Sequence, residues 1–430
     1  MSDKNGRNGE LVKDDRIGSS IIECAPLKQA VVFGTGKMAC GLLGEILYES
    51  GYRTLFIGRR PEIINAINNI YGYFVGIAGV RNHWINVKDC HAVSIQDVET
   101  IVRAVVKADI VFTSVGIDNI PAIAPLIAQG LWSRIKQKRD VVNIIASENL
   151  PGTGSYLRHQ IVGAVSLQDA LLVDHTVGFS AALTHRIMTG GEIIDGKLHY
   201  TVDVPGDLII DKRGIIQPLP ILYHSNVSAE FDALFLEKLS TINLVQAVAS
   251  YLGHLYGCRY VHEAVLHPKI TQVVKSAAAE ATAAFKAEFP HLGATIEYDA
   301  KEAITRITDP GLGDTVTRIC KGPQRKLAAQ ERLIGPARLA VRHGLAYDNL
   351  ALAIAAALLY YDDDDLQSKI MQDIIANEGV DKILTDVCGL LPYEALAQKV
   401  KYNWAKLKGE RNDMAHHASN HISNKAPLRM

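Results

Sequence analysis

The chain has 430 residues, of which 48% are hydrophobic, and its 45 lysine and arginine side chains nearly balance 46 aspartate and glutamate side chains. The net charge of −1 argues against nucleic acid or an anionic membrane as a partner. Six scattered cysteines without a CxxC pair, and no apolar run near the roughly 18 residues of a membrane span, indicate a reduced, cytoplasmic protein.

The chain begins with a polar segment, residues 1–27, that lacks the apolar core of a secretory signal, so we expect a flexible extension. Four short apolar runs follow, with helical spacing of apolar residues between them. These runs lie at 30–33, 54–58, 108–116 and 140–149. Their order predicts an α/β fold, with a Rossmann-type, doubly wound parallel sheet in a dinucleotide-binding domain over residues 28–220. The alternating run at 197–211 predicts antiparallel strands added to that sheet.

From residue 231 onward the pattern changes to long helices, and strand signals nearly vanish. The predicted helices lie at 231–256, 267–288, 324–343, 347–360, 366–377 and 393–408. Because Pro218 and Pro220 precede this change, we place the domain boundary there and predict a mostly α-helical substrate and catalytic domain over 221–408. Residues 409–430 are predicted to form a poorly ordered tail, whose histidines lack the cysteine or carboxylate partners of a metal site.

The first strand leads into VVFGTGKMACG, a G-x-G-x-x-A motif at the start of a helix. Gly34 permits the tight turn, Gly36 lets the backbone approach a pyrophosphate, and Ala39 allows close packing of helix and strand. A strand–turn–helix without a ligand is the alternative, but the strand before the motif and the helix after it favour a dinucleotide site. The predicted cofactor contacts are Gly34, Gly36, Lys37, Met38 and Ala39, with Val115 and Gly116 at the end of the third strand.

The second strand ends in FIGRRPE. Sites that prefer NAD usually place an acidic residue at this strand's end, about 20 residues after the glycine motif, to bind the ribose 2′-hydroxyl. Here Gly58 occupies that position and Arg59 and Arg60 follow, so no carboxylate repels a 2′-phosphate and two guanidinium groups can bind it. The sequence therefore predicts NADP(H) as cofactor, with simple surface arginines as the alternative.

The first predicted helix of the C-terminal domain carries polar residues among apolar ones, in EKLSTINLVQAVASYLG at 237–253. On one continuous helix, Lys238, Asn243 and Gln246 fall within one arc. A surface lysine with a buried stem would explain Lys238 alone, but it explains the two amides less well, since buried amides need partners. A desolvated lysine has a lowered pKa and can exchange protons, which makes Lys238 a candidate acid/base.

Several motifs together carry a family resemblance. They are FGTGKMACGLLG, NIIASEN at 143–149, TVGFSAALTHRI at 176–187, the Lys238–Asn243 pair, and GPQRKLAAQERLIGP at 322–336. Through them the chain resembles the polyol-specific long-chain dehydrogenases, most closely their mannitol-1-phosphate 5-dehydrogenase branch, over about residues 29–405. The resemblance implies that Lys238 is the catalytic acid/base, that Asn149 and Asn243 polarise the carbonyl oxygen, and that the reaction needs no metal.

Two positions depart from the family pattern. Gln246 stands where the family has histidine, and His185, in THRI, stands where the family has aspartate. The family residues hold sugar hydroxyls near the reacting carbon, so these departures concern the substrate and leave the hydride-transfer residues intact. Exchanging a carboxylate for histidine removes negative charge and suits a substrate with an additional anionic or zwitterionic group.

A basic cluster lies in the helix predicted over 324–343. Arg325 and Arg332 lie on nearly the same face of that helix, with Lys326 beside Arg325. Such a cluster can hold a phosphate or a carboxylate. A solvated basic face is the alternative, but the resemblance implies that this segment lies beside the substrate.

Three functions are consistent with these residues. The first is an NADPH-dependent reductase of opine biosynthesis, which the chain resembles and which reduces the C2 keto group of deoxyfructosyl-glutamine or deoxyfructosyl-glutamate to a mannopine-type mannityl opine. The second is a mannitol-1-phosphate (fructose 6-phosphate) dehydrogenase, which Gly58 and the two departures disfavour. The third is an inactive NADP(H)-binding sensor, which the retained Lys238 disfavours. We expect a small keto-sugar conjugate as partner, and a monomer or weak homo-oligomer.

Overall fold

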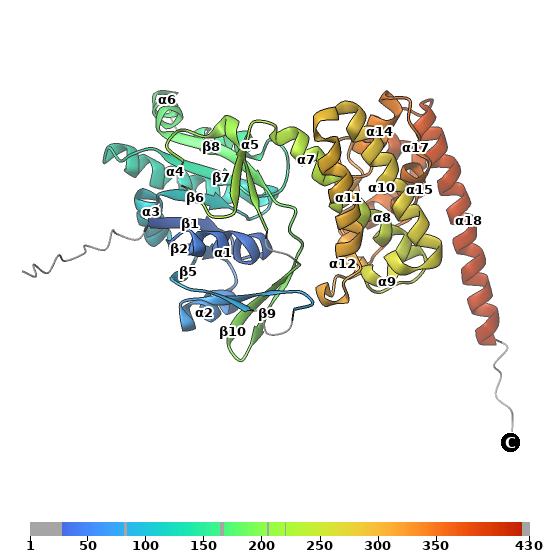
Figure 1. The fold of residues 1–430 in the computed structure, drawn as a ribbon, viewed down its shortest axis with the longest axis horizontal. Coiled ribbons are helices and arrows are strands. Elements are labelled where there is room, and N and C mark those ends of the chain that lie inside the picture. The colour runs from blue at the N-terminus through green and yellow to red at the C-terminus, as the bar shows by residue number, and fades with distance from the viewer. Residues whose placement is uncertain (1–27, 81–83, 164–166, 204–205, 220, 424–430) are drawn as a thin grey trace, which may run out of the picture.

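The computed structural model describes residues 28–80, 84–163, 167–203, 206–219 and 221–423, so the predicted extension over 1–27 lies outside it. The described residues form two domains that lie side by side, an α/β domain and a helical domain (Figure 1). Within these ranges, no helix has both the length and the apolar character that crossing a membrane requires.

The α/β domain is built on an eight-stranded sheet in the order β12-β11-β8-β7-β6-β1-β2-β5. Its strands are β1 (Lys28–Phe33), β2 (Tyr52–Gly58), β5 (Cys90–Ser94), β6 (Ile110–Thr113), β7 (Val142–Ala146), β8 (Val177–Leu183), β11 (Leu208–Asp211) and β12 (Ser225–Ser228). From β8 to β5 all neighbouring strands are parallel, which confirms the predicted doubly wound sheet. Two apolar clusters, one on each face of β1, bury that strand from both sides.

Helices and a second, smaller sheet complete this domain. The helices are η1 (Ala39–Leu43), α1 (Gly44–Glu49), α2 (Pro61–Ile70), α3 (Val98–Lys107), η2 (Ile117–Asn119), α4 (Ile120–Lys136), α5 (Thr153–Val162), α6 (Leu167–Thr176) and η3 (Lys212–Gly214). The smaller sheet has the order β4-β3-β10-β9, with β3 (Tyr73–Ile77), β4 (Trp84–Val87), β9 (Met188–Ile194) and β10 (Lys197–Val202). Of the antiparallel strands predicted to join the main sheet from 197–211, β11 does so by pairing with β8. Strand β10 lies in the smaller sheet, antiparallel to β9 and parallel to β3.

The helical domain packs around one large apolar core, in which α8, α10 and α15 are central. Its helices are α7 (Phe231–Ser240), α8 (Ile242–Leu255), α9 (Val261–Leu266), α10 (Pro268–Glu288), η4 (Pro290–Leu292), α11 (Gly293–Ile307), η5 (Pro310–Leu312), α12 (Val316–Cys320), α13 (Pro323–Lys326), α14 (Ile334–Arg342), α15 (Asp348–Ala357), α16 (Leu366–Glu378), α17 (Val380–Asp386) and α18 (Ala395–Ser423). This arrangement confirms the predicted mostly helical C-terminal region.

Helix α18 lies on the side of the helical domain away from the sheet and extends past its neighbours (Figure 1). It runs to Ser423, so the tail predicted over 409–430 is helical for much of its length. The sequence between 409 and 423 contains no proline, the residue that disfavours a helix most strongly. The tail histidines lie outside the residues whose side chains are described.

The single helix predicted over 231–256 is divided at Thr241 into α7 and α8. The backbone of Thr241 has φ −112° and ψ −102°, outside the helical region. Its hydroxyl donates a hydrogen bond to the carbonyl oxygen of Glu237, at 2.9 Å. Such local bonds from threonine compete with regular helix geometry. Lys238 therefore lies on a different helix from Asn243 and Gln246, and the predicted common arc is wrong.

Helix α7 belongs to the sheet as much as to the helical domain. Its apolar face, with Phe231, Phe235 and Leu239, packs on Ala181 and Leu183 of β8. The strand β12 also lies beyond the boundary predicted at residue 220, because it pairs with β11.

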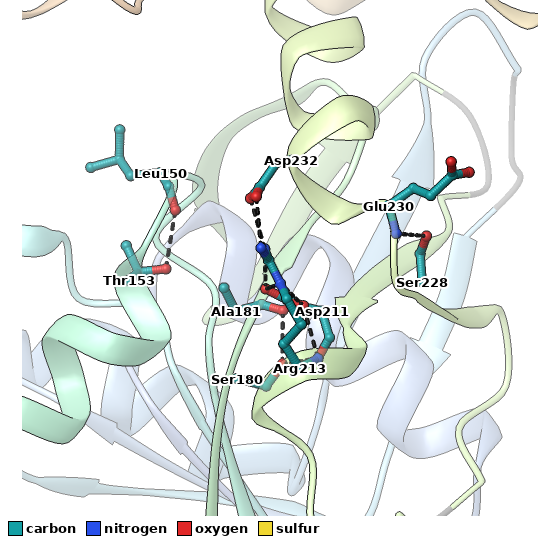
Figure 2. Close-up of polar contacts among 9 residues, drawn as sticks. All are labelled: Leu150, Thr153, Ser180, Ala181, Asp211, Arg213, Ser228, Glu230 and Asp232. Atoms are coloured by element: carbon teal, nitrogen blue, oxygen red, sulfur yellow. Dashed lines mark hydrogen bonds and ion pairs between the residues drawn. The ribbon is translucent and has the colours of Figure 1, made fainter. Parts of the chain in front are cut away.

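An ion-pair network holds the start of α7 at the sheet edge (Figure 2). Arg213 donates to both oxygens of Asp232 on α7, at 2.7 Å each, and also to Asp211 at the end of β11. Bidentate arginine–carboxylate pairs fix orientation as well as distance. The helix that carries Lys238 is thus fastened to the α/β domain.

Candidate active site

A pocket of about 240 Å³ lies at the carboxyl ends of β1, β2 and β6. It brings together five of the predicted cofactor residues, Gly34, Gly36, Arg59, Arg60 and Val115. Gly34 has φ +129°, and a Cβ there would overlap the carbonyl oxygen of Ser114, so only glycine fits. A Cβ at Gly36 would meet no atom within 4 Å, which leaves its backbone open to a ligand.

The other predicted cofactor residues do not line this pocket. Ala39 is fully buried at the start of η1, as its predicted packing role requires, and Met38 precedes it. Gly116, with φ +85°, precedes η2. Burial and the charge of Arg318 lower the pKa of Lys37 to about 8.

A second pocket of about 240 Å³ lies between the two domains. Its lining includes all the predicted catalytic and substrate residues: Asn149, His185, Lys238, Asn243, Gln246, Arg325, Lys326 and Arg332. They come from the end of β7, from the loop between β8 and β9, and from α7, α8, α13 and the α13–α14 connection. Residues that are up to 183 positions apart in the chain, such as Asn149 and Arg332, therefore meet at one site.

Lys238 is almost fully buried in this pocket, with 4% of its surface exposed. Its Nζ donates a hydrogen bond to Oδ1 of Asn149 at 2.5 Å. Burial, together with the charge of Arg332, lowers the pKa of Lys238 to about 7, although Glu237 opposes this shift. An amine with this pKa can give or take a proton at neutral pH.

Asn149 has the left-handed φ of +64°, which asparagine tolerates better than most residues. Because its Oδ1 accepts the bond from Lys238, its Nδ2 group is the part that can donate to a ligand oxygen. Asn243 lines the same pocket from the first turn of α8. An amine and two amides thus converge where a carbonyl oxygen would need donors.

Arg325 and Arg332 form a basic wall of the pocket, but the helix predicted to carry both of them is not continuous. The helix predicted over 324–343 is divided into α13 and α14, so Arg325 and Arg332 do not share one helical face. They are brought together by Glu331, which accepts from Nε of Arg332 at 2.9 Å and lies 3.6 Å from Nη1 of Arg325. Burial would raise the pKa of Glu331, but the charges of Arg332 and Arg325 lower it.

Lys326 has a different environment from the two arginines. Its Nζ donates to the backbone carbonyl oxygens of Ile319 and Lys321, at the end of α12. Burial and the neighbouring arginines lower its pKa to about 7. The ammonium group therefore holds the backbone of the pocket wall, which leaves Arg325 and Arg332 as the stronger candidates for anion binding.

Glu148 is a site residue that the sequence reasoning missed. It precedes Asn149, and its carboxylate accepts from the backbone N–H of Val115 at 3.2 Å and from the hydroxyl of Thr113 at 3.0 Å. Burial raises its pKa, and these hydrogen bonds offset part of that rise. Glu148 thus ties the end of β6, beside the cofactor pocket, to the end of β7, which carries Asn149.

No pattern in the sequence indicated Asp314 and Arg318 as residues of the site. The buried carboxylate of Asp314 accepts from Nε2 of Gln246 at 3.4 Å and pairs with Arg318, which lines the pocket. The acceptor that fixes Gln246 therefore lies 68 residues away in the chain, where no local pattern could reveal it.

The loop that carries His185 is held from both domains. Arg306, on α11, donates to the carbonyl oxygen of His185 at 2.5 Å and pairs with Asp203. The carboxylate of Asp203 in turn accepts from the backbone N–H of Ile187 at 2.9 Å. Within the described residues, no group of three or more potential ligand side chains is placed to bind a metal ion.

Two family models match the chain in the same order as its two domains. The mannitol dehydrogenase Rossmann domain matches residues 28–217, and the mannitol dehydrogenase C-terminal domain matches residues 231–408. The second match begins where α7 begins. Together the two matches cover well over half of the chain.

Named relatives and solved structures agree with this assignment. The chain is 31% identical to mannitol-1-phosphate 5-dehydrogenase of Oceanobacillus iheyensis over 87% of this chain and 97% of that protein. It is also 31% identical to the Bacillus velezensis enzyme of the same name, over 85% of this chain and 97% of that protein. The fold resembles that of Pseudomonas fluorescens mannitol 2-dehydrogenase in its ternary complex with NAD and D-mannitol, with a TM-score of 0.71, 13% identity and coverage of 93% and 95% of the two chains. The chain therefore belongs to the mannitol dehydrogenase family of oxidoreductases, which act on CH–OH groups.

Proposed function

We propose that the protein transfers hydride between NADP(H) and C2 of an open-chain keto sugar that carries an anionic group, with Lys238 as general acid. The observation that supports this most directly is the buried Lys238–Asn149 pair, which lines one pocket together with Asn243, Arg325 and Arg332. The pocket thus combines a proton donor, two amide donors and a basic wall.

The cofactor pocket fits a dinucleotide. The crowded turn at Gly34 and the open backbone at Gly36 suit the close approach of a pyrophosphate. Gly34, Gly36 and Val115 would contact the dinucleotide, and Arg59 and Arg60 would hold a 2′-phosphate. When bound there, the reduced nicotinamide supplies the hydride.

The chain's own residues would complete the reaction at the carbonyl oxygen. Asn149 and Asn243 donate hydrogen bonds to that oxygen and stabilise its developing negative charge. As the C2 carbon gains hydride, the oxygen takes a proton from Nζ of Lys238, so the ketone becomes a secondary alcohol and the lysine becomes neutral. Arg325 and Arg332 would hold the anionic arm of the substrate.

The two reaction directions should respond to pH in opposite ways. Because the pKa of Lys238 is about 7, its protonated form dominates below that pH. We expect kcat for ketone reduction to be level below about pH 7 and to fall about tenfold per pH unit above it, whereas alcohol oxidation should rise up to about pH 7. Initial rates in both directions from about pH 5 to about pH 9 test this. Identical pH profiles in both directions would exclude Lys238 as the titrating group.

NADP(H) preference should depend on the two arginines after β2. We expect Arg59→Ala combined with Arg60→Ala to raise the KM for NADPH by about 10²- to 10⁴-fold, because each of the two charged hydrogen bonds contributes about 1.5–3 kcal/mol, and to leave the KM for NADH nearly unchanged. Arg53→Ala is the matched control, since Arg53 is an exposed arginine on β2 itself. An unchanged KM for NADPH in the double variant would show that Arg59 and Arg60 do not bind the 2′-phosphate.

Deoxyfructosyl-glutamine or deoxyfructosyl-glutamate is the first candidate substrate, which would give a mannopine-type product. His185 and Gln246 support it, because both stand where the resemblance implies other residues and both line the pocket. Arg325 and Arg332 would bind a carboxylate of the amino-acid arm.

Fructose 6-phosphate, with mannitol 1-phosphate in the oxidative direction, is the second candidate. The names of the relatives favour it over the first. Arg325 and Arg332 suit a phosphate as well as a carboxylate, so the basic wall alone does not separate the two substrates.

An NADPH oxidation assay with deoxyfructosyl-glutamine, fructose 6-phosphate and fructose separates the candidates. Turnover of deoxyfructosyl-glutamine alone would support the opine reductase, and turnover of fructose 6-phosphate alone would support the phosphate enzyme. A protein that binds NADPH but turns over none of the three would be a cofactor-binding sensor, which would overturn the proposed function.

A further inference from the structure

We propose that His185, backed by the carboxyl groups of Glu237 and Asp299, forms a subsite that binds the ammonium group beside the reacting carbonyl of an amino-acid-substituted keto sugar. This inference rests on the first substrate of the proposed function. It adds a recognition element for the substrate's cation, whereas Arg325 and Arg332 concern only its anion.

Glu237 is the centre of this subsite. It directly precedes Lys238 on α7, and only 1% of its surface is exposed. Its Oε2 lies 2.7 Å from Nε2 of His185. Its Oε1 lies 3.3 Å from the hydroxyl of Thr241, whose shorter contact, at 2.9 Å, is with the carbonyl oxygen of Glu237. The contact with His185 therefore fixes the carboxylate beside the wall of the pocket.

The contact with Glu237 determines what His185 can offer a ligand. Because Nε2 faces the carboxylate, Nδ1 is the ring nitrogen that remains for the substrate. The ring is 28% exposed and lines the pocket. When Nε2–H donates to Glu237, Nδ1 is an acceptor, so it can take a hydrogen bond from an ammonium group.

Asp299, on α11, adds a second carboxyl group, which interacts with Glu237 and His185. Burial and the charge of Glu237 raise the pKa of Asp299 to about 6, while His185 and Arg306 oppose the rise. Arg306 is already engaged by Asp203 and by the carbonyl oxygen of His185. Two interacting carboxyl groups next to the imidazole of His185 favour a ligand cation at this side of the pocket.

The pocket consequently has walls of opposite charge. Arg325 and Arg332 form its basic wall, and His185, backed by Glu237 and Asp299, forms its acidic wall. A deoxyfructosyl amino acid carries an ammonium group next to C2 and a carboxylate farther along, which matches both walls. A sugar phosphate carries no cation and would leave the acidic wall unused.

The test compares deoxyfructosyl-glutamine with its ether analogue, in which an uncharged oxygen replaces the nitrogen. NADPH oxidation is measured with both compounds for the unmodified protein, for Glu237→Gln and for Glu297→Gln, an exposed glutamate of α11 that serves as control. We expect the unmodified protein and the control to prefer the amine in kcat/KM by about 10- to 100-fold, mainly through KM. In Glu237→Gln that ratio should fall by about tenfold.

The ratio of kcat/KM for the amine to kcat/KM for the ether separates recognition of the ammonium group from the rate of the chemical step. Glu237 also raises the pKa of Lys238, so its loss slows both compounds alike, and this common effect cancels in the ratio. Equal turnover of the two compounds by the unmodified protein, or an unchanged ratio in Glu237→Gln, would overturn the subsite. If neither compound is turned over while fructose 6-phosphate is, the first substrate itself is wrong. Asp299→Asn, on the half-buried member of the cluster, gives the same comparison should Glu237→Gln fail to fold.

Discussion

Replacing Lys238 by alanine should lower kcat for ketone reduction by about 10²- to 10⁴-fold, the range that a positioned acid or base contributes. The loss should fall on the chemical step, because Nζ of Lys238 lies against Asn149 in the substrate pocket and not in the cofactor pocket. Single-turnover NADPH oxidation measures the rate of the chemical step, and fluorescence titration measures NADPH binding. The dissociation constant of NADPH should stay within about threefold of its original value.

The control for this experiment is Lys275→Ala, which removes an exposed lysine from α10 and should leave kcat unchanged. Removal of a buried amine also changes packing, so circular dichroism must show that Lys238→Ala is folded. A folded Lys238→Ala protein that reduces the ketone at the original rate would assign the acid to another residue.

The two amides should have the second largest effect. Asn243→Ala and Asn149→Gly should each lower kcat by about 10²- to 10³-fold with little change in KM, because hydrogen bonds to the developing oxyanion strengthen in the transition state. Glycine is the choice at Asn149 because that residue has φ +64°, where alanine would add backbone strain.

The combined amide variant gives a sharper result than either single one. Because both amides would donate to one oxygen, the double variant should lose less than the product of the two single effects. Asn403→Ala, on the outer helix α18, is the control. If KM rises and kcat is unchanged in the single variants, Asn149 and Asn243 only bind the sugar and do not stabilise the transition state.

The sequence was a good guide wherever a local pattern determined the structure. The turn at Gly34 and the buried Ala39 followed from the spacing of small residues after an apolar strand. The parallel sheet followed from repeated apolar runs. The departures at His185 and Gln246 were visible only against a family pattern, but they led to residues that line the substrate pocket.

The remaining features depend on contacts between distant parts of the chain. The break at Thr241 carries no glycine or proline signal, whereas Gly335 and Pro336, at the start of α14, did mark a break within the helix predicted over 324–343. Glu148 reaches Thr113 across 35 residues, and Glu237 reaches His185 across 52. Periodicity reports which face of an element is apolar but not which polar groups meet across a domain boundary. Lys238 and Asn243 were paired correctly at one pocket, although the continuous helix assumed for them does not exist.

The break at Thr241 gives the protein a natural crossover point for recombination. Upstream of it, α7 is packed on β8 and held by Arg213, so the helix that carries Lys238 is attached to the α/β domain. Downstream, α8 is buried in the helical core and carries the side chains that would touch the sugar. A chimera joined at residue 241 would inherit its proton chemistry from one parent and much of its substrate range from the other, whereas a junction at residue 220 would separate Lys238 from the sheet that positions it.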